Sequence, residues 1–426
     1  MQKCEYNKRD CLLYRSCIKK QINGLILISI KFLGMWEAKK LVNVIICEFN
    51  PFHNGHKYLI SEAKRVTGAY ATVCLMSGNF VQRGQAAIEC KHRRAKAAVL
   101  GGADLVLQIP SAYVLGGAEV FAGAGVSMAA ALKVPSTLVF GAEDTDTDAL
   151  ISLARLGARA VNIRIKAGLK RGLSYARAVY EAYFSLDPVN APRLLKPNNL
   201  LAFEYIKAII KNGAGVGFKA IARKGAGHDS DDTSGEFASA SYIRAHLDTA
   251  QRFMPGPVTD EIDRLRFEQT ALFALKSASA AMLRQCAGVE TGFENRIIWA
   301  AKKALSLDEF YRYAITKRCT LSRLRRVVIS VMVKNPMGLC FTELPYLRVL
   351  AFNDTGRRLL KSLKGRCTKP VIVKPADTPR LGLAGRHFTL EERCTDIYNF
   401  LRVQPVAGGR ECLDSPIYIE KGSCGI

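Results

Sequence analysis

Two histidines, His53 and His56, stand three residues apart in the segment PFHNGH. The apolar run VIICEF before them predicts a buried strand, and a helix is expected to begin near Gly55. A turn from a strand into a helix presents backbone N–H groups to phosphate, and glycine lets the backbone approach a nucleotide closely. Imidazole N–H groups placed there can stabilise the charge that builds on an α-phosphoryl group as pyrophosphate leaves. The segment therefore predicts an ATP-using site in which both histidines are catalytic.

The same loop has alternative interpretations. Two histidines in a turn can be purely structural, although the combination of Asn50, Pro51 and Gly55 disfavours this. A zinc site would need more ligands than the loop offers, and the chain contains neither a GxxxxGK[ST] loop nor a GxGxxG fingerprint. We therefore predict no protein-held metal and expect Mg²⁺ only together with ATP.

The composition bounds the class of protein. The chain has 62 Lys and Arg against 37 Asp and Glu, a net charge of +25, which indicates a polyanionic partner such as nucleic acid. A generally basic proteome is the alternative. No apolar run reaches the ~20 residues that cross a bilayer, so no membrane association is expected. The 13 cysteines form no CxxC pair, which favours reduced thiols and a cytoplasmic location. Nothing in the sequence specifies an oligomeric state.

Short apolar runs alternate with helical stretches after residue 40, which is typical of strand–helix–strand units. We predict an α/β fold with a doubly wound, Rossmann-like parallel sheet. The expected strands are Leu41–Phe49, Ala71–Met76, Asp104–Ile109, Thr137–Phe140 and Phe218–Ile221. Beyond the helix near Gly55, the expected helices are Glu89–Leu100, Gly117–Leu132, Asp146–Ala158, Leu195–Lys211 and Ala240–Leu247.

The composition changes near Pro255, and few strand-like runs follow before Val371. We expect an N-terminal extension at residues 1–34, a catalytic domain at 35–254 and a basic, mainly helical RNA-binding domain at 255–426. Residues 296–369 hold 17 Lys and Arg against 4 Asp and Glu. A solvated helix face is the alternative, but it would normally intersperse opposite charges. The residues expected to contact RNA are Lys317, Arg318, Arg323, Arg325 and Arg326.

Several longer segments carry a family likeness: EFNPFHNGHKYL, MSGNFVQRGQAAI, GADLVLQIP, FGAED, KPNNLLAFEYIK, IARKGAGHD, SASYIR, GFENRI, RVLAFNDTG and TDIYNFLR. In these segments, which span most of residues 41–402, the chain resembles the bacterial tRNA(Met) cytidine acetate ligases of the HIGH-motif nucleotidylyltransferase superfamily. The resemblance implies ATP-dependent acetylation of the wobble cytidine of elongator tRNA(Met). It also implies free acetate as the donor, an acetyl-adenylate intermediate and no use of acetyl-CoA.

The resemblance also implies where ATP binds. The first set of implied contacts is Ile46, Cys47, Glu48, Phe49, Asn50, Pro51, Phe52, His53, Asn54, Gly55, His56, Lys57, Tyr58 and Leu59. The second set is Gly141, Asn198, Asn199 and Arg223. SASYIR occupies the place of the superfamily's second phosphate-binding motif, where Ser239 or Ser241 can cap a helix and Arg244 can reach pyrophosphate. Helix capping alone also explains the serines.

The segment SGNFVQRG and the following helix are expected to serve the second substrate. The candidate contacts to acetate or cytidine are Asn79, Phe80, Arg83 and Lys91. Phe80 would be a stacking platform and Arg83 a partner for acetate or phosphate. A purely structural turn at Gly78 and Gly84 is the alternative.

The two chemical steps differ in their need for a base. Acetate is already anionic and needs only placement in line with the phosphorus. The cytidine amine is a poor nucleophile, so a base would help; Lys91, Glu48 and His92 are candidates that the sequence does not rank.

The chain departs from the family pattern at Gln108, where glutamate is usual, at His92, and in the serine-rich form of SASYIR. Two other functions therefore stay open. One is an adenylyltransferase that acts on a small phosphorylated acceptor, which would leave the basic second domain unused. The other is an inactive, nucleotide-dependent RNA-binding protein.

Overall fold

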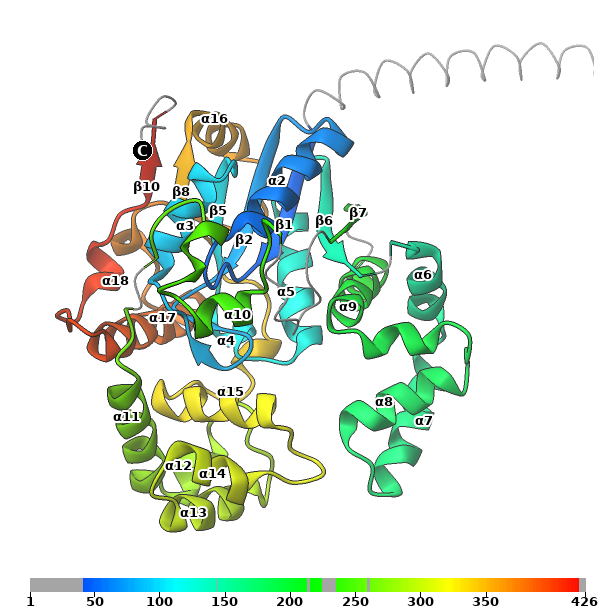
Figure 1. Cartoon of the computed structure of the whole chain (residues 1–426), viewed down its shortest axis with the longest axis vertical. Helices are drawn as coiled ribbons and strands as arrows, with labels where there is room; N and C mark the ends of the chain where they lie inside the picture. The colour runs from blue at the N-terminus through cyan, green and yellow to red at the C-terminus, as the bar shows by residue number, and fades with distance from the viewer. Residues whose placement is uncertain (1–40, 144, 213–214, 224–234, 259–260, 421–426) are drawn as a thin grey trace, which may run out of the picture.

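The computed structural model describes residues 41–143, 145–212, 215–223, 235–258 and 261–420 (Figure 1). The predicted N-terminal extension lies outside these residues. Five parallel strands form the centre of the main sheet, in the order β5-β2-β1-β6-β7. They are β1 (Val42–Cys47), β2 (Ala71–Ser77), β5 (Leu105–Ile109), β6 (Ser136–Ala142) and β7 (Gly217–Ala222). All five predicted strands are confirmed.

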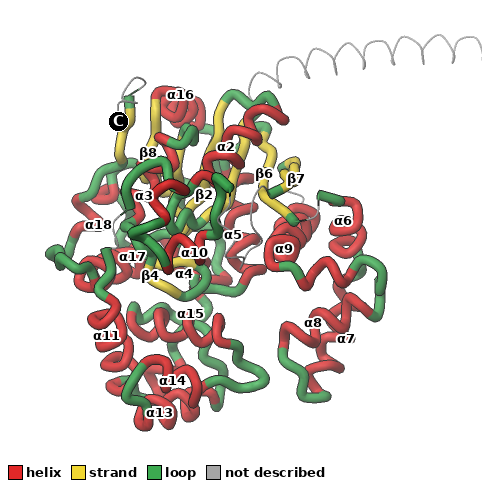
Figure 2. The backbone as a smooth tube through the Cα atoms, in the orientation of Figure 1, coloured by secondary structure: helices red, strands yellow, loops and turns green. Residues whose placement is uncertain are grey.

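Side chains of β1 alternate between two cores, one on each face of the sheet. Val42 and Val44 pack with α5 (Ala118–Ala131) and α9 (Pro197–Asn212). Ile45 and Cys47 pack with α2 (Asn54–Thr67) and α3 (Lys91–Leu100) on the opposite face. Helices thus cover both faces (Figure 2), which confirms the doubly wound fold.

The end of the chain returns to this sheet. Strand β8 (Leu347–Asn353) pairs antiparallel with β5, and β9 (Val371–Ile372) and β10 (Ile417–Ile419) pair parallel with β8. Helix α16 (Asp354–Leu363) follows β8 and adds Leu359 and Leu363 to the core shared with α5. In the described part of residues 255–370, β8 is the one strand, which agrees with the expectation of few strands there. Residues 255–426 therefore supply strands to the main sheet as well as a helical region.

The helical region is built from α11 (Arg264–Ser277), α12 (Ala280–Arg284), α13 (Phe293–Lys303), α14 (Leu307–Ala314) and α15 (Leu321–Met332). They pack around their own apolar core, which α17 (Gly382–Leu401) also joins. The remaining C-terminal elements are η3 (Leu339–Phe341), η4 (Pro375–Asp377) and α18 (Arg410–Leu413). None of the helices in the described ranges combines the length and apolar character that crossing a membrane requires.

A helical insertion separates β6 from α9. It contains α6 (Thr147–Arg155), α7 (Ala158–Lys170), α8 (Tyr175–Phe184) and η1 (Ala191–Leu195). Only the first of these helices was predicted. In Figure 1 the pair α7 and α8 projects from the sheet toward the same end of the molecule as α13 and α14.

Four short elements complete the fold: α4 (Ser111–Val114), α10 (Ala240–Ala245), η2 (Ala250–Phe253) and the hairpin formed by β3 (Phe80–Val81) and β4 (Gln85–Ala86). Helix α10 was predicted. The hairpin contains most of SGNFVQRG, so this segment projects from the carboxyl end of β2 as a small separate sheet.

Candidate active site

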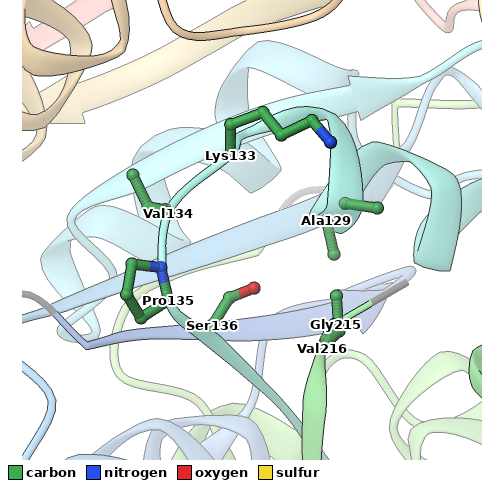
Figure 3. Close-up of a pocket in the computed structure, with 8 residues that line it drawn as sticks. Ala129, Lys133, Val134, Pro135, Ser136, Gly215 and Val216 are labelled. Atoms are coloured by element: carbon green, nitrogen blue, oxygen red, sulfur yellow. The ribbon is translucent and has the colours of Figure 1, made fainter. Parts of the chain in front are cut away.

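The predicted nucleotide-binding residues meet at one edge of the sheet. Parallel strands present their carboxyl ends at the same edge, where α/β proteins bind ligands. The HNGH loop follows β1, the SGNFVQRG hairpin follows β2, Gly141 lies near the end of β6, and Arg223 follows β7. The cavity of about 250 Å³ in Figure 3 lies elsewhere, beside Ser136 and Gly215, where β6 and β7 begin.

The HNGH loop fixes the direction of both imidazoles. His53 is the N-cap of α2, and its Nδ1 accepts a hydrogen bond from the Gly55 backbone N–H at 3.1 Å. Nδ1 of His56 accepts from the His53 backbone N–H at 3.3 Å, and the two rings stack with centroids 3.7 Å apart. Because both Nδ1 atoms accept, the proton of each neutral ring lies on Nε2. Each ring therefore carries a hydrogen-bond donor at Nε2.

Both histidines are neutral at physiological pH. Burial, reinforced by the charges of Arg223 and Arg244, lowers the pKa of His53 to about 3. Burial, followed by His53 and Arg223, holds the pKa of His56 well below its usual value. The rings thus offer hydrogen bonds, and the arginines supply the positive charge.

Three arginines from separate elements gather near these rings: Arg223 and Arg244 act on His53, and Arg83 acts on both of those arginines. Partial burial lowers the pKa of Arg244, and the charge of Arg83 lowers it further. The same two effects lower the pKa of Arg223, against an opposing contribution from Glu143. Arg244 donates to the Asn50 carbonyl at 2.7 Å, so its guanidinium is held against the loop. Like charges gathered in this way suit a polyphosphate ligand.

Asn198 and Asn199 are joined to the site through Glu143. One carboxylate oxygen of Glu143 accepts from the Asn198 side chain at 2.5 Å, and the other accepts from the Asn199 backbone N–H at 3.0 Å. Asn199 is fully buried, whereas Asn198 is partly exposed. Gly141 lies beside Arg223, whose Cγ would be 3.3 Å from a Cβ at this position. Asn198 is therefore the more accessible of the two asparagines.

Several residues of the first predicted ATP set are packed against the protein core. Phe49 and Phe52 are buried and meet edge to face at 5.0 Å. Phe52 packs so closely on Gly101 that a Cβ there would lie 2.3 Å from its ring. A Cβ at Gly125 would likewise overlap the Ile46 side chain. Cys47 Sγ donates to the Leu75 carbonyl at 3.5 Å, and Pro51 is buried. These side chains position the loop.

Other residues of this set lie in the first turns of α2. Lys57 is exposed, and Leu59 is partly buried against the core below α2. The Tyr58 ring meets that of Phe237 edge to face at 6.0 Å. Asn54 donates to the carbonyls of residues 236 and 252, which joins the start of α2 to the segments flanking α10.

Glu48 and Asn50 fasten the SGNFVQRG hairpin to the HNGH loop. A Glu48 carboxylate oxygen accepts from the Gln82 backbone N–H at 2.6 Å, and Asn50 Oδ1 accepts from the Ile88 backbone N–H at 2.9 Å. Arg83, in the turn between β3 and β4, is exposed and lies toward the other two arginines. Glu48 thus holds the hairpin that presents Arg83.

Arg94 is a positioning residue that we did not predict. It is completely buried, and its guanidinium donates to the carbonyls of Glu89 at 2.9 Å, Glu48 at 2.5 Å and Gly78. One side chain therefore ties the loops after β1 and β2 to the start of α3. Its sequence signal is weak because it belongs to the run KHRR, which is typical of a solvent-facing helix.

The candidate acetate and cytidine residues do not gather around an open site. Phe80 is fully buried against Tyr398, so the expectation of an exposed stacking platform was wrong. Asn79 is buried, and its Oδ1 accepts from the Lys91 backbone N–H at 2.9 Å. The Lys91 ammonium is also buried and contacts Glu411 at 2.5 Å. Of the four, Arg83 alone is exposed.

Two of the three departures from the family pattern, Gln108 and His92, lie beside this ammonium. Gln108 accepts from Lys91 with its carbonyl oxygen and donates to Glu391 with its amide nitrogen, so the position uses both ends of the amide. Burial, followed by the charge of Lys91, lowers the pKa of His92 to about 3. Neither side chain is exposed.

In SASYIR, the two serines have separate roles. Ser239 caps α10 by accepting from the Tyr242 backbone N–H at 3.0 Å. Ser241 accepts from Arg244 at 3.2 Å and so helps to hold the guanidinium in the site. Capping explains Ser239, and positioning of Arg244 explains Ser241.

The predicted RNA-contacting run divides into exposed and structural residues. Lys317 and Arg318 are exposed in the turn before α15. Arg323 pairs with Glu290 at 2.8 Å, and Arg326 donates to the Gln82 carbonyl at 3.3 Å. Arg325 is half-buried beside the hairpin. Helix α15 therefore supports the SGNFVQRG hairpin as well as facing solvent.

Within the described ranges, no group of three or more His, Cys, Asp and Glu side chains could hold a metal ion. Magnesium carried on the phosphates of ATP would enter as part of the substrate.

A parallel sheet with an HxGH loop after its first strand defines a nucleotidyl transferase of the HIGH class. The family model for HIGH nucleotidyl transferases matches residues 41–409. A tRNA(Met) cytidine acetate ligase of Thermoanaerobacter sp. is 33% identical over 83% of this chain and 94% of its own. The corresponding ligase of Clostridium kluyveri is 32% identical over 88% of this chain and 98% of its own. The chain belongs to the tRNA(Met) cytidine acetate ligase family.

Solved structures agree with this assignment. The apo crystal structure of Thermotoga maritima TmcAL superposes with a TM-score of 0.81 at 27% identity, covering 89% of this chain and 100% of the other. A second crystal form of that protein, bound with alpha-thio ATP, gives a TM-score of 0.80 at 26% identity.

Proposed function

We propose that the protein is an ATP-dependent ligase that activates acetate as acetyl-adenylate and acetylates the wobble cytidine of elongator tRNA(Met). Acetyl-CoA takes no part, and the reaction occurs in the cytoplasm, where ATP and tRNA are present. The observation that carries the proposal is the pair of stacked imidazoles that the HNGH loop holds beside Arg223 and Arg244. Family membership supplies the identity of the acceptor.

In the first step, an acetate oxygen attacks the α-phosphorus of ATP and pyrophosphate leaves with the electrons of the broken P–O bond. The Nε2–H groups of His53 and His56 donate to phosphate oxygens on which charge builds. The three guanidiniums hold the triphosphate and the departing pyrophosphate. This step needs no proton transfer, which agrees with two histidines that stay neutral.

In the second step, the cytidine amine attacks the acetyl carbon, AMP leaves, and the nitrogen loses a proton. None of the three candidate bases is suited to accept this proton, because two already bind other groups and the third has a low pKa. Glu48 holds the Gln82 N–H, Lys91 is buried against Glu411, and His92 has a pKa near 3. We therefore infer that placement of the amine contributes more than a dedicated protein base, with the AMP phosphate available to accept the proton.

Incubation of the purified protein with ATP, radiolabelled acetate and bulk tRNA tests the function. We expect label in acetylcytidine after digestion to nucleosides, and none when labelled acetyl-CoA replaces acetate. The His53→Ala His56→Ala variant should lose both the RNA product and acetate-dependent ATP–pyrophosphate exchange. His53→Asn keeps a capping acceptor and an N–H donor, so it should retain more exchange than His53→Ala.

The outcomes separate the alternatives. Exchange without labelled RNA would leave the activation step standing and contradict the acceptor. Neither exchange nor product, with ATP and tRNA still bound, would favour the inactive RNA-binding protein. Adenylyl transfer to a small phosphorylated acceptor would favour the adenylyltransferase.

A further inference from the structure

The helical insertion between β6 and α9 is rooted at the candidate active site. The chain leaves the sheet at the end of β6, beside Glu143, and returns at α9, whose first turn contains Asn198 and Asn199. An ion pair between Arg193 and Asp146, at 3.0 Å, closes the base of the insertion. Helices α7 and α8, which we call the α7–α8 arm, are thereby held in a fixed relation to the nucleotide-binding edge.

The surface of the arm is strongly basic. Residues 158–184 contain six Lys and Arg against one acidic residue, Glu181. All six cations are exposed: Arg159, Arg164, Lys166, Lys170, Arg171 and Arg177. Glu181 pairs with Arg171 at 2.9 Å and Arg177 at 2.8 Å, which leaves most of the positive charge uncompensated. A solvated helix pair would be expected to carry a more even mixture of charges.

A pocket of about 700 Å³ opens on the arm between its two helices. Arg164, Arg171 and Arg177 line it together with two aromatic rings, Tyr180 and Phe184. These rings stack at 5.8 Å, and the Arg177 guanidinium lies 5.7 Å from the centre of the Tyr180 ring. Phe184 is 44% exposed, although an apolar ring of this size is usually covered.

Guanidinium groups interleaved with exposed aromatic rings suit RNA. Arginine binds phosphate oxygens through its planar fork, and an aromatic face stacks on an unpaired base. We propose that the α7–α8 arm is a second RNA-binding surface, which binds the sugar–phosphate backbone of the tRNA away from the reacting cytidine. This inference rests on the proposed function for the identity of the RNA. In Figure 1 the arm and helices α13 and α14 extend toward the same end of the molecule, so one RNA can contact both.

Direct tRNA binding by the full-length protein tests the assignment. Arg164→Glu reverses a pocket-lining charge that is exposed and makes no ion pair within the described part of the chain. We expect it to weaken binding of a tRNA(Met) transcript about tenfold at low salt, as the loss of one charge-assisted contact should. The slope of log affinity against log salt should fall by about 0.7 to 0.9. Arg177→Gln, which leaves Glu181 its Arg171 partner, should act in the same direction.

Lys133→Glu is the matched control, because it makes the same change of charge as Arg164→Glu at an exposed position just before β6, at the edge of the sheet opposite the candidate active site. Its tRNA affinity should stay close to that of the wild type. Acetate-dependent ATP–pyrophosphate exchange without RNA should be unchanged in all three variants. Unaltered tRNA affinity and salt slope in both arm variants would overturn the assignment, as would an equal loss in Lys133→Glu. tRNA binding is measured directly and does not depend on turnover. Failure of the proposed function would instead appear as an absence of ATP–pyrophosphate exchange in the wild type.

Discussion

Gly84 forms the turn that brings the SGNFVQRG hairpin against α15. Its φ is +74°, and a Cβ built there would lie 2.5 Å from the Arg326 backbone nitrogen and 2.6 Å from the Arg325 carbonyl carbon. Backbone atoms of a helix cannot move aside as the end of a flexible side chain can. Gly365 provides a matched position, because its φ is +78° and a Cβ there would meet nothing within 4 Å.

The two alanine variants therefore separate conformation from contact. The left-handed backbone should cost each variant about 1 kcal/mol of unfolding free energy. Gly84→Ala also forces its Cβ to overlap the backbone of α15, and such overpacking costs about 1 to 3 kcal/mol. The total loss of unfolding free energy in Gly84→Ala should therefore be about 2 to 4 kcal/mol. Equilibrium urea unfolding measures both. Because the hairpin carries Arg83, Gly84→Ala should also reduce ATP–pyrophosphate exchange, whereas Gly365→Ala should not. Equal destabilisation of the two variants, or full exchange activity in Gly84→Ala, would refute this reasoning.

Three further predictions follow from the site and its surroundings. Gly55→Ala places a Cβ 2.9 Å from the His53 ring; we expect loss of the cap, about 1 kcal/mol by urea unfolding, and at least about tenfold slower pyrophosphate exchange. The pKa of His53 is about 3 in the folded protein, below its unfolded value of about 6.5. The unfolded chain therefore binds the proton first as the pH falls. The contribution of His53 to the unfolding free energy is complete above about pH 6.5 and declines by up to about 1.4 kcal/mol per pH unit below it. His53→Asn should show a shallower loss of unfolding free energy between about pH 7 and pH 5, and an unchanged slope would contradict the neutral histidine. Lys91→Met leaves the buried Glu411 carboxylate without its ammonium and should cost about 3 to 5 kcal/mol, part of which Lys91→Met Glu411→Met should recover in the same measurement.

The local features of the fold could be predicted because each has a local cause. The strands before His53 and Arg223 are short apolar runs, and the helix after His53 begins at a turn of Asn, Pro and Gly. The carboxyl ends of parallel strands then bring the HNGH loop, Gly141 and Arg223 together without further information.

Features that depend on distant pairing could not be predicted in the same way. Strand β8 has a suitable apolar run, but its antiparallel pairing with β5 joins segments more than two hundred residues apart. Phe80 and Lys91 have residue types that suit chemistry, yet Tyr398 and Glu411, supplied by the last helices, cover them. The helical pattern near α7 and α8 was not assigned at all, and it contains the basic pocket.

The charge state of the site explains why neutral histidines suit an enzyme that already gathers three guanidiniums. Protonated imidazoles at His53 and His56 would add two like charges to Arg83, Arg223 and Arg244, and the empty site would repel itself. Burial keeps the rings neutral, so they add hydrogen-bond donors without that cost. In the proposed mechanism, the triphosphate meets donors already oriented by the loop backbone and positive charge already held by the loop and hairpin. That mechanism leaves binding energy available for the in-line placement of acetate, because little reorganisation would remain when ATP enters.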